Sequence, residues 1–567
     1  MSDSIFVTTS ESDLKFENRT FLEFVDERSF ETKGNISFSN CIFKNPLILE
    51  NIIAREISFF DCHFEKQFYL GKSTFHFISL FGCNSSDIDI VSNTADFLSL
   101  RDIKGKHLEL NGYYRELQII SSKVENVLIN DVNSNYSHRE SKVEFLVGNQ
   151  FKELKLKCSN IFSEIIFKGS SYDTIFFEGE FKKKIEFSRE VSISNLYFES
   201  SIFQSRIDFE DGNFEYVSFY RSSFHGIVYI SDLSSVKTDP RDIKIKSLTF
   251  HSSNFEKDVT VNISELEMFN TSNCNYKEVL NLNNYRDNKD GGELTIFSMD
   301  GINQGSIVLQ RLYADISLSG INFGNIYFKD IDISSLYLND YQNVGILSFS
   351  NIRTGNYFVI QNTTSGKMNF INSDVNLFGE IIIADSNIDG ANFYKYPNKI
   401  LARSKNPIAG YGIKKRSLRI LNLKNVYNQL KRIAKTKGDI DIASKFESLE
   451  HRQLLLSKRF GFDSILLFLN YLSNNNGNNW FRGVVFTLTI GLLFFILYLK
   501  TLNVQFYLNE DYKDYVIFIS SFPKLELEKY STLNSEWETQ FVLWLSRIFI
   551  SYGIYQTIAA FRKYGKG

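Results

Sequence analysis

An eight-residue pattern that returns about every 21 residues constrains this chain more than any other feature. Apolar or small side chains in Ile36–Phe43 stand two, then three, then two residues apart, and the pattern returns in Ile57–Phe64. It begins again at Ile78, and it recurs with the same step in Leu196–Phe203 and Val217–Phe224. A fixed period of about 20 residues is typical of a solenoid, in which each repeat forms one coil.

The spacing inside the pattern predicts the shape of a coil. Two side chains separated by two residues lie on one face of a strand, and a step of three turns a corner without leaving the interior. Inward pairs therefore recur every five residues, and four such sides make a coil of about 20 residues. From Ile36 to Phe393 we expect about 17 coils, stacked to a length of about 80 Å.

Aromatic residues are unusually frequent in this chain, which contains 54 Phe and 29 Tyr and therefore cannot be a disordered protein. Phe fills one inward slot of each pattern, and small residues fill the other: Cys41, Cys62, Cys83, Ser201 and Ser222. The three cysteines have two interpretations, a reactive thiol cluster or a buried ladder of small residues, and we favour the ladder. Five Cys in 567 residues exclude a disulfide scaffold.

One stretch identifies a family that the repeat resembles. Ser386-Asn-Ile388-Asp-Gly, followed by Ala391-Asn-Phe393, is similar to the unit of the pentapeptide-repeat proteins. That resemblance implies a four-sided, right-handed β-helix. Most coils show only one clear pair of pentapeptides, and a step of 31 marks residues 231–247 as an insertion. The expected fold is therefore all-β over residues 1–395, an irregular right-handed β-solenoid with coils of about 20–21 residues. An array of β-sandwiches is disfavoured by the strict spacing.

Charge divides the chain into three segments that the net charge of −3 conceals. Residues 399–459 carry 16 Lys and Arg against 4 Asp and Glu, a net charge of +12. Residues 460–567 carry 9 and 8, and residues 1–398 carry 38 and 54, a net charge of −16. An acidic body, a basic neck and a nearly neutral tail follow one another.

The neck, residues 396–460, is predicted to be a basic helical hairpin. An apolar stripe at helical spacing runs through Leu423, Val426, Tyr427, Leu430, Ile433 and Ala434. Gly438 ends that helix, and Asp439 or Asp441 begins the next. We expect this hairpin to pack on the last coil and to shield its apolar end.

The tail, residues 461–567, is predicted to be a membrane domain. Gly483–Leu499 contains no charge, and Phe541–Phe561 contains only Arg547. Because a spanning helix needs about 20 apolar residues, we expect transmembrane helices at 482–500 and 540–561, joined by an external loop, 501–539. An interfacial helix is expected at 461–472. Two buried core helices are the alternative.

Positive charge sets the expected orientation. The basic neck precedes the first span, Arg562, Lys563 and Lys566 follow the second, and residues 501–540 contain 3 Lys and 7 acidic residues. Since Lys and Arg stay on the cytoplasmic side, both termini are expected in the cytoplasm and both spans in the inner membrane. The sequence starts without an apolar signal segment.

The neck and tail together also carry a resemblance. Gln429-Leu430-Lys431, Gly438–Phe446, Leu469-Asn470, Ser473-Asn474 and Ala560–Gly565 are similar to the C-terminal region of bacterial membrane proteins with pentapeptide-like repeats. The resemblance implies the architecture, a solenoid followed by a basic neck and two spans. It implies no biochemical activity.

Sequence signals for catalysis are lacking. The seven His do not stand at metal-ligand spacing, and no Cys-x-x-Cys, phosphate-binding glycine loop or nucleophile elbow occurs. We therefore expect no enzyme, no metal and no cofactor.

Polar and small residues inside the predicted spans are the functional candidates. Small residues predict a packing face on each helix: Gly483, Thr487 and Gly491 on the first, and Ser546, Gly553 and Thr557 on the second. Arg547, Ser551 and Gln556 are polar positions in the second span, and charged or amide side chains in a membrane need a partner or a polar path.

Two hypotheses follow from the sequence. In the first, a homo-oligomer of at least four copies forms an ion channel or pore, lined by the second span and gated through the solenoid and neck. The architecture suggests, by analogy, an effector in bacterial stress or anti-phage defence. In the second, the spans only tether a scaffold whose solenoid binds proteins.

The neck cations have two interpretations as well. An anionic nucleotide or oligonucleotide could bind there, or the charge could serve membrane topology and attraction to anionic lipid, which we favour. The candidate contacts are Lys414, Lys415, Arg416, Arg419, Lys431 and Arg432.

Overall fold

The structure is a computed structural model that describes residues 13–133, 141–161, 163–188, 190–231, 243–263, 265–283, 295–405, 412–458, 461–520 and 537–564. The chain divides into two compact units. The first, residues 1–358, 366–379 and 393–397, consists of solenoid coils. The second, residues 359–365, 380–392 and 398–567, holds the last strands and all the α-helices of the described part.

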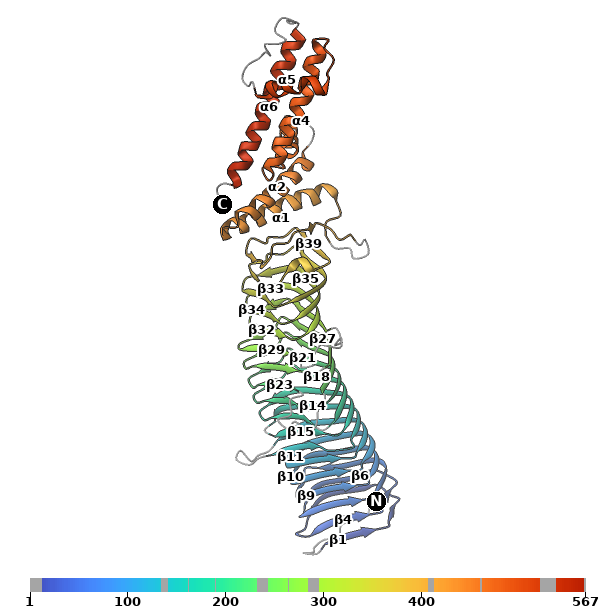
Figure 1. Ribbon diagram of the computed structural model, residues 1–567. Coiled ribbons are helices and arrows are strands. Elements are labelled where there is room, and N and C mark those ends of the chain that lie inside the picture. Colours follow the sequence, from blue (N-terminus) through green and yellow to red (C-terminus); the bar gives the residue numbers. More distant parts are fainter. Residues whose placement is uncertain are drawn as a thin grey trace. The chain divides into compact units, whose positions relative to one another are not determined.

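The strands run from β1 (Leu14–Glu17) to β41 (Ile400–Leu401), and most are short. The long ones are β10 (Asn84–Arg101), β11 (Lys104–Ile120), β12 (Lys123–Asn133), β14 (Gln150–Ile161), β16 (Ser171–Phe181), β33 (Tyr313–Asn322) and β35 (Asp332–Asn343). In the first unit each strand pairs in parallel with the strand one coil away, so that the strands stack along the coil axis (Figure 1). This is the arrangement that the repeat period predicts.

Among the described residues, one column of paired residues runs through the stack from Leu14 to Met368 and counts its coils. Every member is apolar, because each occupies the same inward position of its coil. The column has 17 members: Leu14, Ile36, Ile57, Ile78, Leu98, Leu117, Val143, Ile165, Ile185, Ile207, Val228, Val259, Leu280, Ile307, Ile326, Leu347 and Met368. The prediction of about 17 coils is confirmed.

The interior is filled by columns of aromatic rings and of small residues. Ile36, Phe38, Cys41 and Phe43 are all at most 1% exposed, as the two-three-two spacing predicts. Phe38 stacks on Phe59 of the next coil with ring centroids 4.8 Å apart, which matches the spacing of paired strands. Much of the phenylalanine excess therefore has a structural cause, because rings of neighbouring coils stack in runs, such as Phe16, Phe38 and Phe59, or Phe328, Phe349 and Phe370.

Corners of the coil are made by residues with left-handed backbone. Asn40, Asp61 and Gly82 have φ values of 51°, 50° and 66°, and each directly precedes one of the inward cysteines. Asn, Asp and Gly tolerate this conformation better than other residues. These residue types therefore mark in the sequence where the three-residue step turns.

Buried polar residues form hydrogen-bonded ladders in place of rings. In one, Asn303 donates to the Oδ1 of Asn322 at 2.7 Å, and Asn322 donates to the Oδ1 of Asn343 at 2.8 Å. The same amides donate to backbone carbonyls of their own coils, so buried groups that would be costly if unpaired are satisfied. Such a ladder fixes the register of neighbouring coils.

The repeated octets occupy two different sides of the coil. Ile36 belongs to the 17-member column, whereas Leu196 pairs with Ile175 and Val217 in a separate column. Phe219 pairs with Phe250, a step of 31, so the predicted insertion is confirmed, and residues 232–242 within it lie outside the described part. The period alone could not assign sides, because both sides use the same spacing.

The helices of the second unit are α1 (Arg416–Lys437), α2 (Ile440–Ser457), α3 (Phe462–Asn474), α4 (Trp480–Thr501), α5 (Leu508–Ser520) and α6 (Trp537–Tyr564). Gly438, with φ of 82°, ends α1 as expected. Val426, Tyr427, Leu430, Ile433 and Ala434 of the predicted stripe are buried, and Leu423 is half-buried. Helices α1 and α2 pack side by side as a hairpin (Figure 1).

Two amide side chains of α1 bind the backbone of the last coil, which includes β39 (Glu380–Ala384). Asn422 donates to the carbonyl of Ile383 at 2.6 Å and accepts from the amide of Asp385 at 2.8 Å. Gln429, seven residues later on the same face, accepts from the Ile388 amide at 2.6 Å and donates to the Ser386 carbonyl at 3.1 Å. The two amides supply hydrogen bonds that a further strand would make, and so they cap an otherwise open sheet edge.

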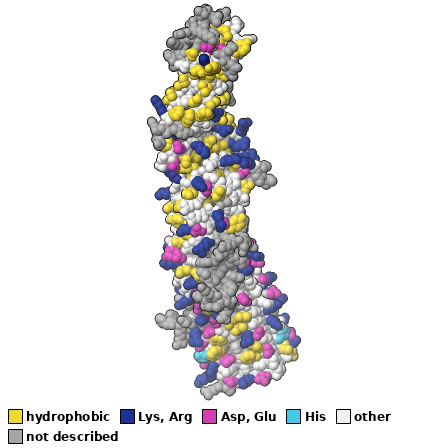
Figure 2. Space-filling view, in the orientation of Figure 1, with side chains coloured by type: hydrophobic (Ala, Val, Ile, Leu, Met, Phe, Trp, Pro, Cys, Tyr) yellow, Lys and Arg dark blue, Asp and Glu magenta, His cyan; other side chains and the backbone are white. Residues whose placement is uncertain are grey.

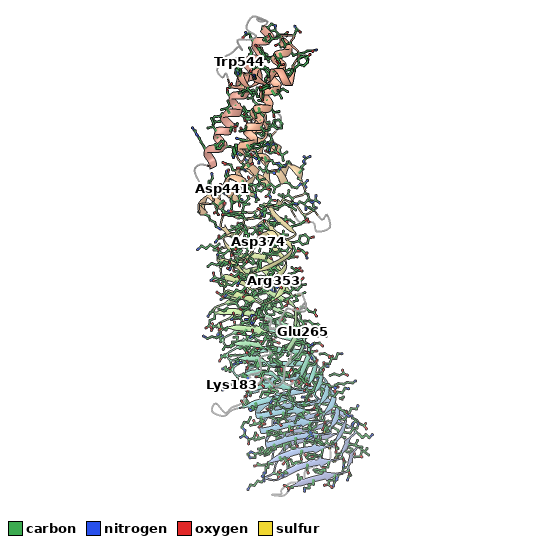
Figure 3. The ribbon with its side chains drawn as sticks, in the orientation of Figure 1. Lys183, Glu265, Arg353, Asp374, Asp441 and Trp544 are labelled. Carbon is green, nitrogen blue, oxygen red and sulfur yellow. The ribbon has the colours of Figure 1, made fainter. Side chains whose placement is uncertain are left out.

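Helix α4 is long and apolar enough to cross a membrane, and within the described residues it alone passes that test. Hydrophobic side chains gather over the long helices, whereas Lys and Arg gather at the level of α1 and α2 (Figure 2). Trp544 of α6 and Asp441 of α2 lie near opposite ends of the helical unit (Figure 3). The expected second span, 540–561, lies within α6.

Candidate functional site

Small residues bring α4 and α6 into close contact. A methyl group on Gly483 would stand 2.7 Å from the Thr557 hydroxyl oxygen, and one on Gly553 would stand 2.4 Å from that of Thr487. Each threonine donates to the carbonyl of the glycine four residues before it, at 2.8 Å in α4 and 2.9 Å in α6. The predicted packing residues of the two helices therefore meet each other in two glycine–threonine pairs. Ser546 of α6 is fully buried.

Helix α5 occupies part of the segment expected as an external loop. The chain returns to α4 after that helix ends: Phe506, just before α5, contacts Phe495, and the hydroxyl of Tyr515 in α5 donates to the carbonyl of Leu488 at 2.5 Å. Gly491, expected to face the second span, instead contacts Ile519 of α5. Leu488 lies 13 residues before Thr501, the end of α4, so Tyr515 contacts α4 about 20 Å before that end. Residues 521–536 of the expected loop lie outside the described part.

Arg547 joins α6 to the C-terminal end of α5. Its Nη1 donates to the carbonyl of Phe518 at 2.6 Å, and its guanidinium lies 5.0 Å from the centre of the Phe518 ring. The last carbonyls of a helix lack intrahelical donors and carry partial negative charge, which a cation stabilises. The side chain is only 6% exposed, and its Nε and Nη2 have no hydrogen-bond partner among the described residues. A buried cation with unpaired donors is costly, so its position is a specific feature of the bundle.

Gln556 belongs to a polar cluster between α3 and α6. It donates to the Oδ1 of Asn470 at 2.7 Å and accepts from the Nδ2 of Asn474 at 2.6 Å. The hydroxyl of Tyr552 donates to the same Asn470 oxygen at 2.5 Å. The partners of Gln556 were not predicted from the sequence. A pair of asparagines four residues apart on the short apolar helix was the signal that could have indicated one.

Ser551 lies between Arg547 and Gln556 in the sequence, but it belongs neither to the contact with α5 nor to the polar cluster with α3. It is half-buried, and its hydroxyl bonds to the carbonyl of Arg547 in its own helix. The three polar residues of the second span therefore do not form one cluster. Arg547 is hydrogen-bonded to α5, and Gln556 is hydrogen-bonded to α3.

The outer face of α3 is apolar and exposed. The side chain of Phe462 is 82% exposed, and further exposed apolar residues follow it: Ile465, Leu466, Phe468 and Leu472. The polar residues Ser473 and Asn474 of the same helix are buried. An inward polar face and an outward apolar face are the reverse of a helix in water, and they suit one that contacts lipid.

The neck cations separate into two groups. Lys431 pairs with Glu450 at 2.6 Å and Arg432 with Asp389 at 2.7 Å, so both are engaged within the fold. Lys414, Lys415 and Arg416 are exposed and Arg419 is half-buried, and no ion pair of theirs occurs among the described residues. A 300 Å³ cavity lies beside Arg432, Thr436 and Lys437, and Asp389 is part of its wall. The negative charge of Asp389 disfavours the binding of an anion in this cavity.

The cysteine column, Cys41, Cys62 and Cys83, consists of buried thiols of low reactivity. Cys62 and Cys83 donate to backbone carbonyls one coil below, at 3.5 Å. Burial raises the pKa of Cys41, and the hydrogen bond to Cys83, with burial, raises the pKa of Cys62 well above its usual value. Since the thiolate is the reactive form, these thiols fit the ladder interpretation.

A half-exposed group on the outside of the solenoid was missed by the sequence analysis. Asp89, His107 and Glu109 offer one ligand atom each, all within 4.8 Å of one another. Asp89 pairs with Glu109 on the next coil, so linear metal-ligand spacing could not find it. Gln67 and Asn130 already donate to the two carboxylates, which satisfies them without an ion.

Comparisons with protein-family models, with curated proteins and with solved structures found no significant match to this chain.

Proposed function

We propose that this chain is a membrane-anchored β-solenoid protein that assembles into an oligomeric ion channel or pore-type effector. The observation that carries the proposal is Arg547, which is buried against the end of α5 instead of facing solvent. A pair of helices that only anchors a protein in a membrane requires neither a buried cation such as Arg547 nor an additional helix such as α5. A channel needs polar groups and irregular elements at membrane depth.

The second span is supported by the packing of α6 on α4. The two helices touch from Trp480 and Phe561 at one end to Phe494 and Phe549 further along. A bilayer that surrounds α4 must therefore contain the facing part of α6. With the basic neck retained in the cytoplasm, both termini are cytoplasmic and the protein lies in the inner membrane. The solenoid is then cytosolic, and we assign it to the right-handed pentapeptide type.

An oligomer is required because two spans cannot enclose a pore. Four or more copies would do so, with α6 lining or gating the path and the solenoid and neck acting as the ligand-sensing part. The exposed cations Lys414, Lys415 and Arg416 are the proposed contacts for an anionic lipid or nucleotide. Bacterial stress or anti-phage defence is the setting that this architecture suggests.

The test measures current through planar bilayers containing the purified full-length protein, with Arg547→Met and Arg547→Lys compared to wild type. We expect discrete current steps from wild type. Methionine should change the open probability by about tenfold, because a charge-assisted hydrogen bond to α5 is lost, and lysine should restore part of it. Absence of current under every condition, together with a monomeric mass in detergent, would refute the channel.

A membrane-tethered scaffold is the alternative, and one observation favours it. The outside of the solenoid carries exposed apolar side chains on neighbouring coils, among them Ile53, Phe60 and Phe77, which are 41–48% exposed. Such residues are typical of surfaces that bind proteins. The same bilayer recording separates the two functions, because a scaffold conducts no current.

A further inference from the structure

Tyr471 of α3 lies between two arginines from different helices. The guanidinium carbon of Arg482, in the first turn of α4, lies 5.2 Å from the centre of the tyrosine ring. That of Arg452, on α2, lies 5.9 Å from the same centre. Both distances fall within the range of cation–π contacts. The ring therefore holds two positive charges close together at the junction of α2, α3 and α4.

The geometry of α2 explains why Arg452 arrives there. Ser444, Ser448 and Arg452 stand four residues apart and so share one face of the helix. Ser444 donates to the Oδ1 of Asn478 at 2.6 Å, and Ser448 donates to the carbonyl of Asn475 at 2.8 Å. The next turn of this face brings Arg452, whose side chain is exposed, to Tyr471, so the fold places the arginine beside the ring.

Among the described residues, these two positive charges have no negative partner. Glu450 of α2 binds Lys431 and Asp463 of α3 binds Lys458, each at 2.6 Å. Within the described residues neither Arg452 nor Arg482 forms an ion pair. Like charges that share one ring repel each other, and the start of a helix adds further positive potential at Arg482. An anion at this point would offset both the repulsion between the two arginines and the positive potential of the helix start.

The surroundings indicate what kind of anion fits. Trp480 precedes the arginine by two residues and packs on Phe561, an aromatic pair typical of the membrane interface. Along α4, Phe481 is 61% exposed and Val485 is 45% exposed, and α3, which carries Tyr471, also has exposed apolar side chains. The charges thus sit where the exposed apolar surface begins.

We propose that Arg452, Tyr471 and Arg482 form a site for the phosphate of an anionic phospholipid, whose acyl chains lie on α3 and α4. The two guanidiniums donate to the phosphate oxygens, a pairing that arginine favours geometrically. The inference rests on the proposed insertion of α4 into a membrane. Because Asn470 and Asn474 join α3 to Gln556 of α6, a lipid held at Tyr471 is one hydrogen-bonded step from the proposed gating helix.

The test counts bound lipid by native mass spectrometry of the full-length protein in detergent, titrated with phosphatidylglycerol or phosphatidylcholine. The double variant Arg452→Gln/Arg482→Gln should bind phosphatidylglycerol about tenfold or more weakly, since two charge-assisted contacts are lost. The matched control is Lys399→Gln/Lys435→Gln, which removes the same charge from exposed positions and should change binding less than twofold. Tyr471→Leu keeps both charges, and it should weaken binding by releasing the arginines.

Three outcomes would overturn the site. Equal losses in both double variants would show a diffuse charge effect. Unchanged binding in the arginine variant would place the lipid elsewhere. Displacement of the lipid by inorganic phosphate at equal concentration would mean that the ligand is a free phosphate. Alkaline extraction of membranes tests the underlying assumption separately: wild-type protein that washes out would refute membrane insertion itself, whatever the lipid counts show.

Discussion

The two amides of α1 that bind the last coil offer the sharpest test of how this molecule is held together. Replacing Asn422 by leucine keeps a side chain of similar size at a buried position of the helix. It removes the donor to the Ile383 carbonyl and the acceptor for the Asp385 amide. The Gln429 contacts remain in place.

The expected cost follows from the groups left without partners. A buried backbone group that loses its hydrogen bond costs about 1–3 kcal/mol, and two such groups are affected, one of them at an exposed residue. We therefore expect the docking of α1 to weaken by about 2–4 kcal/mol. Gln429 lies seven residues away, about 10 Å along the helix, so Gln429→Leu should add to this cost almost independently.

Hydrogen exchange at the Ile388 amide is the appropriate measurement. That amide keeps its bond to Gln429 in the variant, so it exchanges when α1 undocks. A loss of about 2–4 kcal/mol predicts exchange faster by about 30- to 1,000-fold. Asn425→Leu is the matched control, because Asn425 is exposed on the same helix, and it should alter exchange less than twofold. If hydrogen exchange becomes faster at the Asp385 amide but not at the Ile388 amide, α1 does not dock as a unit and the predicted loss of docking energy is refuted.

Two further predictions concern the solenoid itself. Phe59→Ala should destabilise it by about 3–5 kcal/mol, because the ring is fully buried and stacks on Phe38, and an unshifted thermal melt would contradict this. Hydrogen bonds from Lys277 and then from His225 lower the pKa of Glu256 to about 2 from its usual 4.5. A carboxyl whose pKa is lowered by folding stabilises above its usual pKa and loses that contribution as the pH falls towards the folded value. The difference in melting temperature between wild type and Glu256→Gln should accordingly shrink over that range, and a constant difference would rule out this linkage.

The solenoid could be predicted from the sequence because its contacts are periodic. Phe38 touches Phe59, the equivalent residue of the next repeat, so the spacing alone encodes the contact. The column to which each octet belongs was not predictable, since every side of a coil uses the same two-three-two spacing. The corners were predictable in principle from Asn40 and Asp61, whose residue types favour the left-handed conformation.

The helical unit was harder to predict because its polar contacts are not periodic. The partners of Gln556 lie 82 and 86 residues earlier in the chain, and nothing in the spacing connects them. Arg547 was recognised as costly in a membrane, but its partner is a backbone carbonyl of Phe518, and every residue has such a carbonyl. The expected loop concealed α5 because polar and acidic residues at its start outweigh the apolar end.

Because the corners of successive coils are in register, they determine how the length of the solenoid can change in evolution. Asp61 and Gly82 stand at equivalent corners, one coil apart. Removing the segment 62–82, from one corner to the next, would join equivalent points and leave every column continuous, whereas removing half of it would leave an incomplete coil and break the strand pairing. Length is therefore adjustable only in whole coils. The distance spanned by the solenoid can be changed by duplication or loss of single coils, in steps of about 4.8 Å, without redesigning either end.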